Sequence, residues 1–203
     1  MTADVTWVRE VSEQASSWDE LRQVSSGCVA CPLHSGRTQV VFADGSAPAD
    51  VMFVGEAPGE QEDLTGVPFV GRSGQLLSSL IAEVGIERSQ VVIANVIKCR
   101  PPANRDPLPA EVETCRFWLR RQVQLVDPAV ICTVGAFATR WALGPDARIT
   151  KVRGQRFTVA GRLVIPTFHP AAALRSGPNG EQMQALRSDI GLLASVIAEV
   201  RAR

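Results

Sequence analysis

Four of the five cysteines in the chain are spaced so that their thiolates can share one metal site. Cys28 and Cys31 form a C-x-x-C pair in a loop, Cys99 follows an apolar run, and Cys115 lies in the next helical segment. Four thiolates can hold a tetrahedral zinc ion or a [4Fe–4S] cluster, and the number of ligands does not separate the two. The odd number of cysteines argues against a disulfide framework.

The other candidate ligands have plainer interpretations. Cys132 lies within an apolar run and is typical of an inert core residue. His34, three residues after Cys31, is an alternative zinc ligand, although a solvated loop histidine is the more common case. Two loop cysteines beside two buried ones remain the alternative without any metal.

A carboxylate, an amide and one of the two histidines each follow an apolar run. Glu56 comes after residues 51–54, Asn95 after 91–94 and His169 after 163–167. If these runs are parallel strands, the three side chains lie at the same edge of the sheet. Ligands of open α/β sheets bind beyond the carboxyl ends of the strands. The sequence therefore predicts a ligand site at that edge.

The elements that must position these residues follow from hydrophobic periodicity. The runs 51–54, 91–94, 130–134 and 163–167 are apolar throughout, which is typical of strands buried on both faces. Helical patterns cover residues 73–84, 109–126, 135–143 and 181–200, and short helices are expected within residues 1–26. The segment from residue 156 onward resembles a β-hairpin that turns at Gly161-Arg162. We predict an α/β fold, a three-layer α/β/α sandwich with a mainly parallel four-stranded central sheet.

The bulk composition favours an ordinary globular protein. The 203 residues, 45% of them hydrophobic, fit one domain over 1–203, with an N-terminal helical and cluster-binding segment at about 1–35. The chain has 21 Lys and Arg residues and 21 Asp and Glu residues, so its formal net charge is zero. Because the chain as a whole is not basic, DNA binding would require arginines clustered on one face. The N-terminal residues do not resemble a signal peptide and no apolar run is long enough to cross a bilayer. We expect a cytoplasmic monomer without a membrane partner.

Three motifs carry a resemblance to a known family. The sequence GEAPG at 55–59, continuing to PFVG at 68–71, resembles the first motif of the family 4 uracil-DNA glycosylases. NVIKCRPP at 95–102, with Asn104 and Arg105 next, is similar to the second motif, and FHPA at 168–171 to the third. The four cysteines resemble the positions at which these enzymes hold a [4Fe–4S] cluster, with zinc as the alternative.

The resemblance implies an enzyme of base excision repair. Such an enzyme hydrolyses the N-glycosidic bond of deoxyuridine in single- or double-stranded DNA, releases uracil and leaves an abasic site. It implies that His169 hydrogen-bonds the uracil O2 as negative charge develops, that Asn95 recognises the O4/N3 edge, and that Phe69 stacks on the base. The backbone of Gly55, Glu56 and Ala57 is expected to line the pocket. Core packing is the alternative for Phe69.

One catalytic role is not assigned by the resemblance. The best-known superfamily members have an aspartate that steers the attacking water where this chain has Ala57, which has no side-chain acceptor. We expect Glu62, Asn104 or Glu56 to share that work. A second departure is Ala172, where relatives often have a larger aromatic residue.

The DNA contacts are expected near the third motif and among the arginines. The base must leave the duplex to enter such a pocket, and Leu174 or Arg175 can fill the vacated stack. The candidate phosphate contacts are Arg72, Arg100, Arg105, Arg153 and Arg175.

Other functions remain open at this stage. One is a superfamily relative that binds uracil-DNA tightly and traps the product through a loop histidine, although residues 100–114 contain no histidine. Another is a non-enzymatic metal or iron–sulfur interaction module, in which the cysteines only stabilise the fold. A third is an electron-transfer protein.

Overall fold

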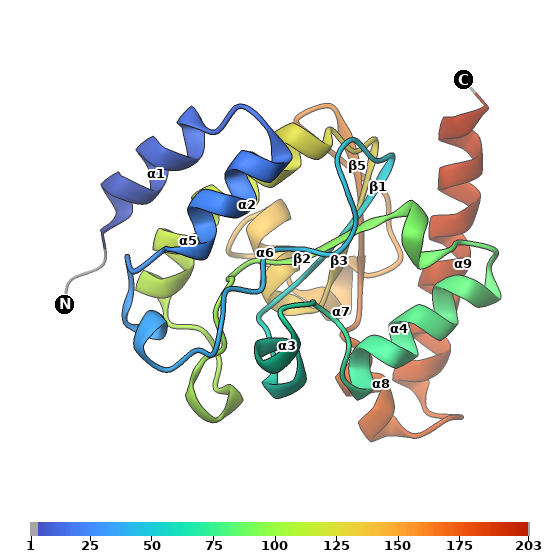
Figure 1. Ribbon diagram of the computed structural model, residues 1–203. Coiled ribbons are helices and arrows are strands. Elements are labelled where there is room, and N and C mark those ends of the chain that lie inside the picture. The colour runs from blue at the N-terminus through green and yellow to red at the C-terminus, as the bar shows by residue number, and fades with distance from the viewer. Residues whose placement is uncertain (1–3, 203) are drawn as a thin grey trace.

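The computed structural model describes residues 4–202, which contain a five-stranded β-sheet with helices on both faces (Figure 1). The strands are β1 (Val51–Gly55), β2 (Val92–Asn95), β3 (Val130–Val134), β4 (Phe157–Val159) and β5 (Arg162–Thr167), in the spatial order β2-β1-β3-β5-β4. β4 pairs antiparallel with β5 at one edge, and the other pairs are parallel. The predicted mainly parallel sheet is confirmed, but its strand number was wrong by one, because the short first arm of the predicted hairpin also joins the sheet.

Alternate residues of the central strands face opposite layers. Met52 and Val54 of β1 pack into one hydrophobic core, whereas Val51 and Phe53 pack into the other. Every residue of β1, β2 and β3 is buried. Burial on both faces is the reason that these strands are continuous apolar runs in the sequence. The predicted three-layer architecture is confirmed.

Each face of the sheet is covered by its own set of helices. One core is built with α1 (Val5–Gln14), α2 (Trp18–Ser26), α5 (Pro109–Val126) and α6 (Ala136–Leu143), and the other with α4 (Arg72–Glu83), α8 (Pro170–Ser176) and α9 (Glu181–Arg201). In Figure 1, α1, α2 and α5 lie to the left of the sheet, and α4 and α9 to its right. The helices predicted within 1–26 are present from Val5, and residues 1–3 lie outside the described residues.

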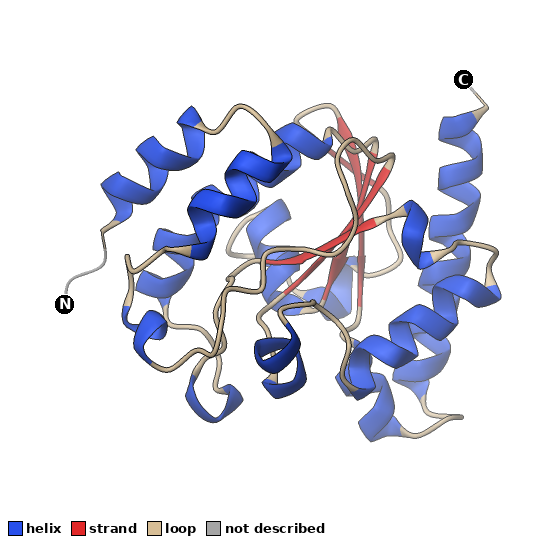
Figure 2. Cartoon of the chain, viewed as in Figure 1, coloured by secondary structure: helices blue, strands red, loops and turns tan. Residues whose placement is uncertain are grey.

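Several shorter elements were not predicted from periodicity. Besides α8, they are α3 (Glu60–Thr65), α7 (Ile149–Val152) and the 3₁₀ turns η1 (Pro32–Ser35), η2 (Arg88–Gln90) and η3 (Pro102–Asn104), which join the main helices and strands (Figure 2). They are too short to show a helical repeat. The hairpin turn lies at Ala160 and Gly161, both with positive φ as a type I′ turn requires, so the predicted turn was one residue late. Within residues 4–202, every helix is too short or too polar to span a membrane.

Candidate active site and cysteine-lined cavity

The carboxyl ends of β1, β2 and β5 border one cavity of about 680 Å³. Parts of its rim come from α3 and α8, which lie below the sheet in Figure 1. Ten residues singled out in the sequence line it: Glu56, Ala57, Glu62, Phe69, Arg72, Asn95, Asn104, Arg105, His169 and Arg175. This volume is in the range of sites for small molecules and cofactors. The predicted convergence at one sheet edge is therefore present in the structure.

Asn95 lines this cavity and has a side-chain acceptor without a donor among residues 4–202. The residue ends β2, is 2% exposed, and pairs in register with Gly55 of β1. Its side-chain Oδ1 is buried and has no hydrogen-bond donor among residues 4–202. A buried polar atom without a partner costs free energy, so a ligand with an N–H group is the natural partner for this oxygen.

Phe69 forms one wall of the cavity in an unusual backbone conformation. It has a φ of 55°, is 6% exposed, and its ring centroid lies 5.8 Å from that of His169. Arg88 holds this turn by donating to Phe69 O at 3.1 Å and to Pro68 O at 2.6 Å. Left-handed backbone at a bulky residue is rare and persists only when its surroundings hold it. The ring is thus fixed at the cavity by contacts to its own peptide.

Gly55 leaves the space between these two side chains open. A Cβ atom at this position would lie 2.5 Å from Asn95 Oδ1 and 2.5 Å from two ring carbons of Phe69. Real Cβ atoms essentially never approach other atoms so closely, so Asn95 or Phe69 would have to shift. The absence of a side chain at Gly55 is therefore a requirement of the cavity.

His169 presents one defined face of its imidazole to the cavity. Its Nδ1 accepts a hydrogen bond from the backbone N–H of Ala171 at 3.2 Å, which places the ring proton on Nε2. Burial, assisted by the nearby Arg175 charge, lowers the pKa of His169 from 6.5 to about 4, and Glu62 opposes this shift. At neutral pH the ring is a neutral donor.

Glu56 and Glu62 differ in what their carboxylates contact. Glu62 accepts from the backbone N–H groups of Gly59 at 3.0 Å, Val70 at 3.0 Å and Gly71 at 2.8 Å, and so ties the two halves of the first motif together. Glu56 lines the cavity, and burial raises the pKa of its carboxyl group to about 7, assisted by Asp106 and opposed by Arg140. A carboxylate titrating near 7 can act as a general base, whereas the Glu62 carboxylate already accepts three backbone N–H groups.

Asn104 lies on the rim with its side-chain oxygen already engaged. Its Oδ1 accepts from Arg100 Nε at 2.8 Å. The same Arg100 guanidinium lies 3.7 Å from a carboxylate oxygen of Glu60. Asn104 therefore holds a loop arginine and has less capacity to orient a water molecule than its place in the motif suggested.

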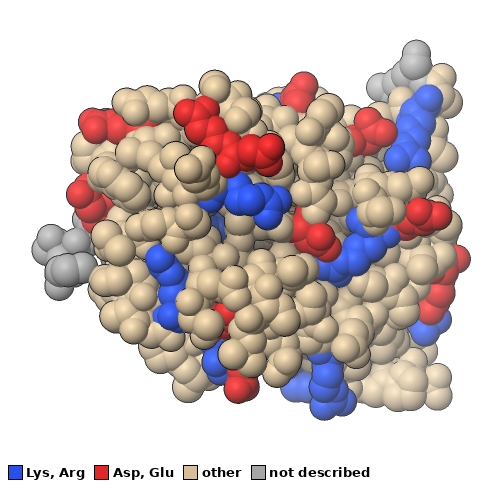
Figure 3. Space-filling model, viewed as in Figure 1, with Lys and Arg blue, Asp and Glu red and all other residues tan. Residues whose placement is uncertain are grey.

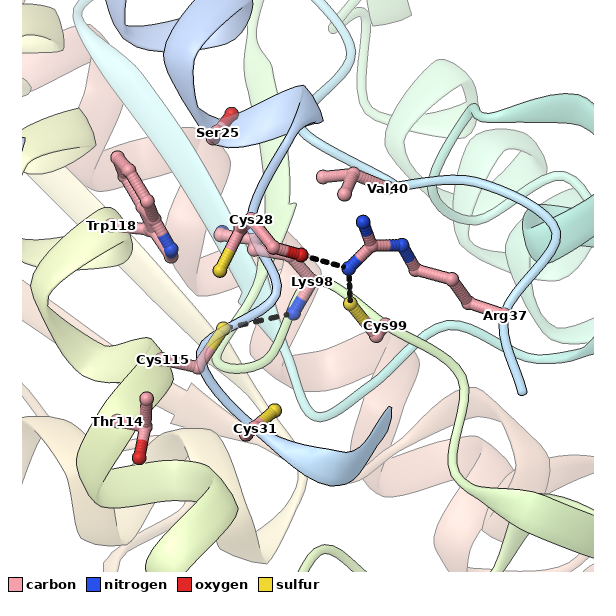
Figure 4. Close-up of a pocket in the computed structure, with 10 residues that line it drawn as sticks. All are labelled: Ser25, Cys28, Cys31, Arg37, Val40, Lys98, Cys99, Thr114, Cys115 and Trp118. Carbon is pink, nitrogen blue, oxygen red and sulfur yellow. Dashed lines mark hydrogen bonds between the residues drawn. The ribbon is translucent and has the colours of Figure 1, made fainter. Parts of the chain in front are cut away.

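The four cysteines of the predicted ligand set line a second cavity, on the α5 side of the sheet (Figure 4). Arg37 Nη1 donates to Cys99 Sγ at 3.2 Å and to Cys28 O at 2.6 Å, and the Lys98 N–H donates to Cys115 Sγ at 3.3 Å. Cys132 is buried in the opposite core, as expected. Hydrogen bonds to thiolate sulfurs are a recurring feature of metal and cluster sites.

A bound metal ion or cluster would supply the positive charge that the thiolates of this cavity require. No group of three or more His, Cys, Asp or Glu side chains within 4–202 is close enough to hold one metal ion, although the four cysteines surround a common space. His34 Nδ1 instead lies 2.8 Å from Cys31 O. Burial raises the pKa of Cys31, Cys99 and Cys115, so these thiols need a bound cationic centre in order to ionise.

Comparison with known proteins identifies the family. The model of the uracil DNA glycosylase superfamily matches residues 42–190. A type-4 uracil-DNA glycosylase of Thermotoga maritima is 49% identical over 154 residues, which are 75% of this chain and 80% of that protein. Those of Sulfurisphaera tokodaii and Archaeoglobus fulgidus are 44% and 43% identical, over 78% and 77% of this chain and 76% and 82% of their own. The chain belongs to the type-4 uracil-DNA glycosylases.

The arginines of the glycosylase divide into paired and unpaired groups. Arg153 forms an ion pair with the buried Asp189, and Arg105 forms a bidentate pair with the buried Glu111, so their charges are already compensated. Among residues 4–202, Arg72 and Arg175 have no acidic partner and line the active-site cavity. Figure 3 shows scattered charges of both signs on one face rather than one continuous basic patch. Arg105 and Arg153 thus already have a counter-charge, and their contacts with phosphate stay predictions.

Three residues of the glycosylase that matter to the two cavities were not identified from the sequence. Arg88 holds the Phe69 turn, Lys98 lies between the cavities, and Gln122 accepts from Lys98 Nζ at 2.5 Å. Lys98 stands inside the second motif and is one of two lysines in the chain, which was an available signal. Leu174, the predicted wedge, is 36% exposed on α8 beside the cavity residue Arg175.

Proposed function

We propose that this type-4 uracil-DNA glycosylase excises uracil by holding the flipped base between Phe69, Asn95 and His169. The observation that carries the proposal is the buried Asn95 Oδ1, which has no partner among residues 4–202 and faces the space that Gly55 leaves open. This oxygen accepts from uracil N3–H, and the amide N–H group donates to O4. Cytosine offers the opposite pattern of donor and acceptor at these positions, so the amide discriminates against it.

Bond cleavage develops charge at two places, and the chain has a group for each. As the bond between C1′ and N1 breaks, negative charge spreads onto the uracil O2, where the Nε2–H of His169 donates to it. A preorganised neutral donor of this kind lowers the barrier without first giving up a proton. The Nδ1 contact with the Ala171 N–H keeps the proton on the correct nitrogen.

The attacking water needs a base that the first motif does not supply at Ala57. Glu56 fills this role in our proposal, because it lines the cavity and has its pKa raised to about 7. Its carboxylate takes a proton from water as the oxygen bonds to C1′, and uracil leaves as an anion that is protonated afterwards. Glu62 and Asn104 hold the surrounding loops.

The four cysteines Cys28, Cys31, Cys99 and Cys115 would hold a [4Fe–4S] cluster in this proposal. We propose a cluster rather than zinc because the four cysteines resemble the positions at which type-4 uracil-DNA glycosylases hold one, and all four line the same cavity. A cluster bound there ties the η1 loop to β2 and α5 and so stabilises the fold around the active site. The partner we propose is uracil-containing DNA, single- or double-stranded, bound by one copy of the chain.

Two measurements test these proposals. A uracil-containing oligonucleotide incubated with the protein and then with hot alkali should break at the uracil position. Asn95→Asp should lose this activity, because a carboxylate cannot donate to O4. Retained activity in this variant would contradict the assignment of Asn95.

Metal analysis tests the cluster independently of cleavage. Protein purified without oxygen should be yellow-brown with about four irons per chain. Cys115→Ala should lose the colour, whereas Cys132→Val, which changes a thiol of the opposite core, should keep it. Colourless active protein with one zinc per chain would overturn the cluster and leave the glycosylase assignment intact.

A further inference from the structure

Lys98 places a buried side-chain nitrogen between the cysteine-lined cavity and Asn95. It is one of two lysines in a chain whose other cations are all arginine, and its residue is 2% exposed. Its Nζ donates to Asn95 O at 2.6 Å and to Gln122 Oε1 at 2.5 Å. Gln122 is itself buried on α5 and donates to Phe42 O at 2.9 Å. All three hydrogen bonds are buried inside the protein.

Both acceptors of Lys98 Nζ are neutral oxygens, and burial lowers the pKa of this group to about 7, a shift that negative charge on Cys115 and Cys99 opposes. Within 4–202 no carboxylate forms an ion pair with Lys98. A buried charge is costly unless a counter-charge compensates it. The groups beside it that can carry negative charge are the cysteines, since Lys98 lines their cavity, precedes Cys99 and donates its N–H to Cys115 Sγ (Figure 4).

The backbone N–H of Lys98 contacts Cys115, whereas its side-chain Nζ contacts Asn95, a residue that lines the active-site cavity. Asn95 O, which accepts the hydrogen bond from Lys98 Nζ, belongs to the same residue as the buried Oδ1 that has no donor among residues 4–202. The segment from Asn95 to Cys99 thus closes a small loop, with the Lys98 side chain folded back onto its start. A displacement of this loop moves the Asn95 amide, and errors of about 1 Å in a catalytic geometry can cost about a hundredfold in rate.

We propose that Lys98 is a positioning residue, an ammonium that takes the ligated cysteines as its counter-charge and in turn holds Asn95 in place to recognise the base. The inference rests on the cluster and on the role of Asn95 proposed above. The cysteine site then does more than stabilise the fold at a distance from the active site. Loss of the ligated cysteines would leave the buried charge of Lys98 without a counter-charge next to Asn95.

The first test measures iron release. Lys98→Met keeps the length of the side chain and removes its charge, and Lys151→Met makes the same change at the other lysine, on the exposed side of α7. Loss of a group that supports metal ligands typically costs ten- to a hundredfold in affinity. We expect Lys98→Met to lose visible absorbance to an iron chelator about tenfold faster than the wild type, and Lys151→Met to lose it at the wild-type rate.

The second test asks whether Lys98 acts through Asn95. Single-turnover cleavage is measured for Lys98→Met, Asn95→Ala and the double variant. If Lys98 serves to place the Asn95 amide, its loss should cost about ten- to a hundredfold alone and little once that amide is gone, because coupled residues are not additive. A purely structural role predicts losses that multiply in the double variant.

Each outcome decides the proposal. Iron release from Lys98→Met at the wild-type rate, or multiplicative losses in the double variant, would overturn it. If Lys98→Met does not fold, Lys98→Gln takes its place. The Gln side chain can still donate a hydrogen bond but has no charge, so this variant should also release iron faster than the wild type. Release at the wild-type rate would again overturn the inference. A wild-type protein without iron, or Asn95→Ala cleaving normally, would instead refute the proposed function on which the inference rests.

Discussion

The backbone N–H of Ala171 donates to Nδ1 of His169 at 3.2 Å, and this contact sets the tautomer of the imidazole. The donor lies in the first turn of α8, two residues after the histidine, so the strand end and the helix start orient the ring together. Because Nδ1 is the acceptor, Nε2 carries the proton and the ring can donate into the cavity without becoming charged.

His169→Ala should therefore impair the chemical step more than binding. Removal of one oxyanion donor costs about 10²–10³ in rate. We expect single-turnover cleavage at saturating enzyme to fall by that factor, while the affinity for uracil-DNA in a binding assay changes little. A variant that binds poorly but cleaves normally once bound would make the histidine a binding group only.

The lowered pKa of His169 also predicts how stability depends on pH. Between pH 6.5 and about 4 the unfolded chain binds a proton at this ring that the folded chain does not. The contribution to the free energy of unfolding is thus fully present above pH 6.5 and is lost as the pH falls toward 4. Denaturant titrations should show a smaller acid loss for His169→Ala than for the wild type, and parallel curves would contradict the shift.

Glu56 should give the cleavage rate an acid limb. Its pKa is raised to about 7, mainly by burial, so below pH 7 the carboxylate is increasingly protonated and cannot take a proton from water. We expect the single-turnover rate to fall about tenfold for each pH unit below 7 and Glu56→Gln to be about 10²–10⁴ slower. The decisive comparison is the pH profile of Glu56→Gln, which should be flat over this range; a surviving acid limb assigns the base elsewhere.

Gly55→Ala should close the base cavity without unfolding the protein. The added methyl group would lie 2.5 Å from Asn95 Oδ1 and from the Phe69 ring, where the uracil must enter. We expect cleavage to fall at least a hundredfold, with a lowered melting temperature but a cooperative transition by circular dichroism. Gly191→Ala, on α9 with no atoms within 4 Å of the new methyl group, is the matched control and should cleave like the wild type.

The arginines should separate by their effect on salt dependence. Arg72 and Arg175 line the active-site cavity without an acidic partner among residues 4–202, so Arg175→Ala should weaken DNA binding and reduce the slope of log affinity against log salt by about one. Arg153→Ala instead leaves the buried Asp189 unpaired and should lower the melting temperature while its salt slope stays unchanged. A reduced slope for Arg153→Ala would instead assign it as a phosphate contact.

The elements of this fold were largely predictable because their signals are local. The helix over Pro109–Val126 was predicted to the residue, since Pro109 begins it and the apolar stripe continues to Val126. The hairpin turn and the short helices of three to seven residues were less predictable, because each is held by contacts to other segments rather than by a repeat of its own.

Which residues meet at the site was predictable from the sequence alone, whereas their partners were not. Parallel strands end at one edge of the sheet, so strand order along the chain already placed Glu56, Asn95 and His169 together. Tertiary structure decided that Glu62 binds backbone amides, that Arg153 pairs with Asp189, and that Lys98 joins Asn95 to the cysteines. The physical reason is range: burial patterns repeat within a few residues, but hydrogen bonds and ion pairs such as Arg153–Asp189, 36 residues apart, form only after folding brings their segments together.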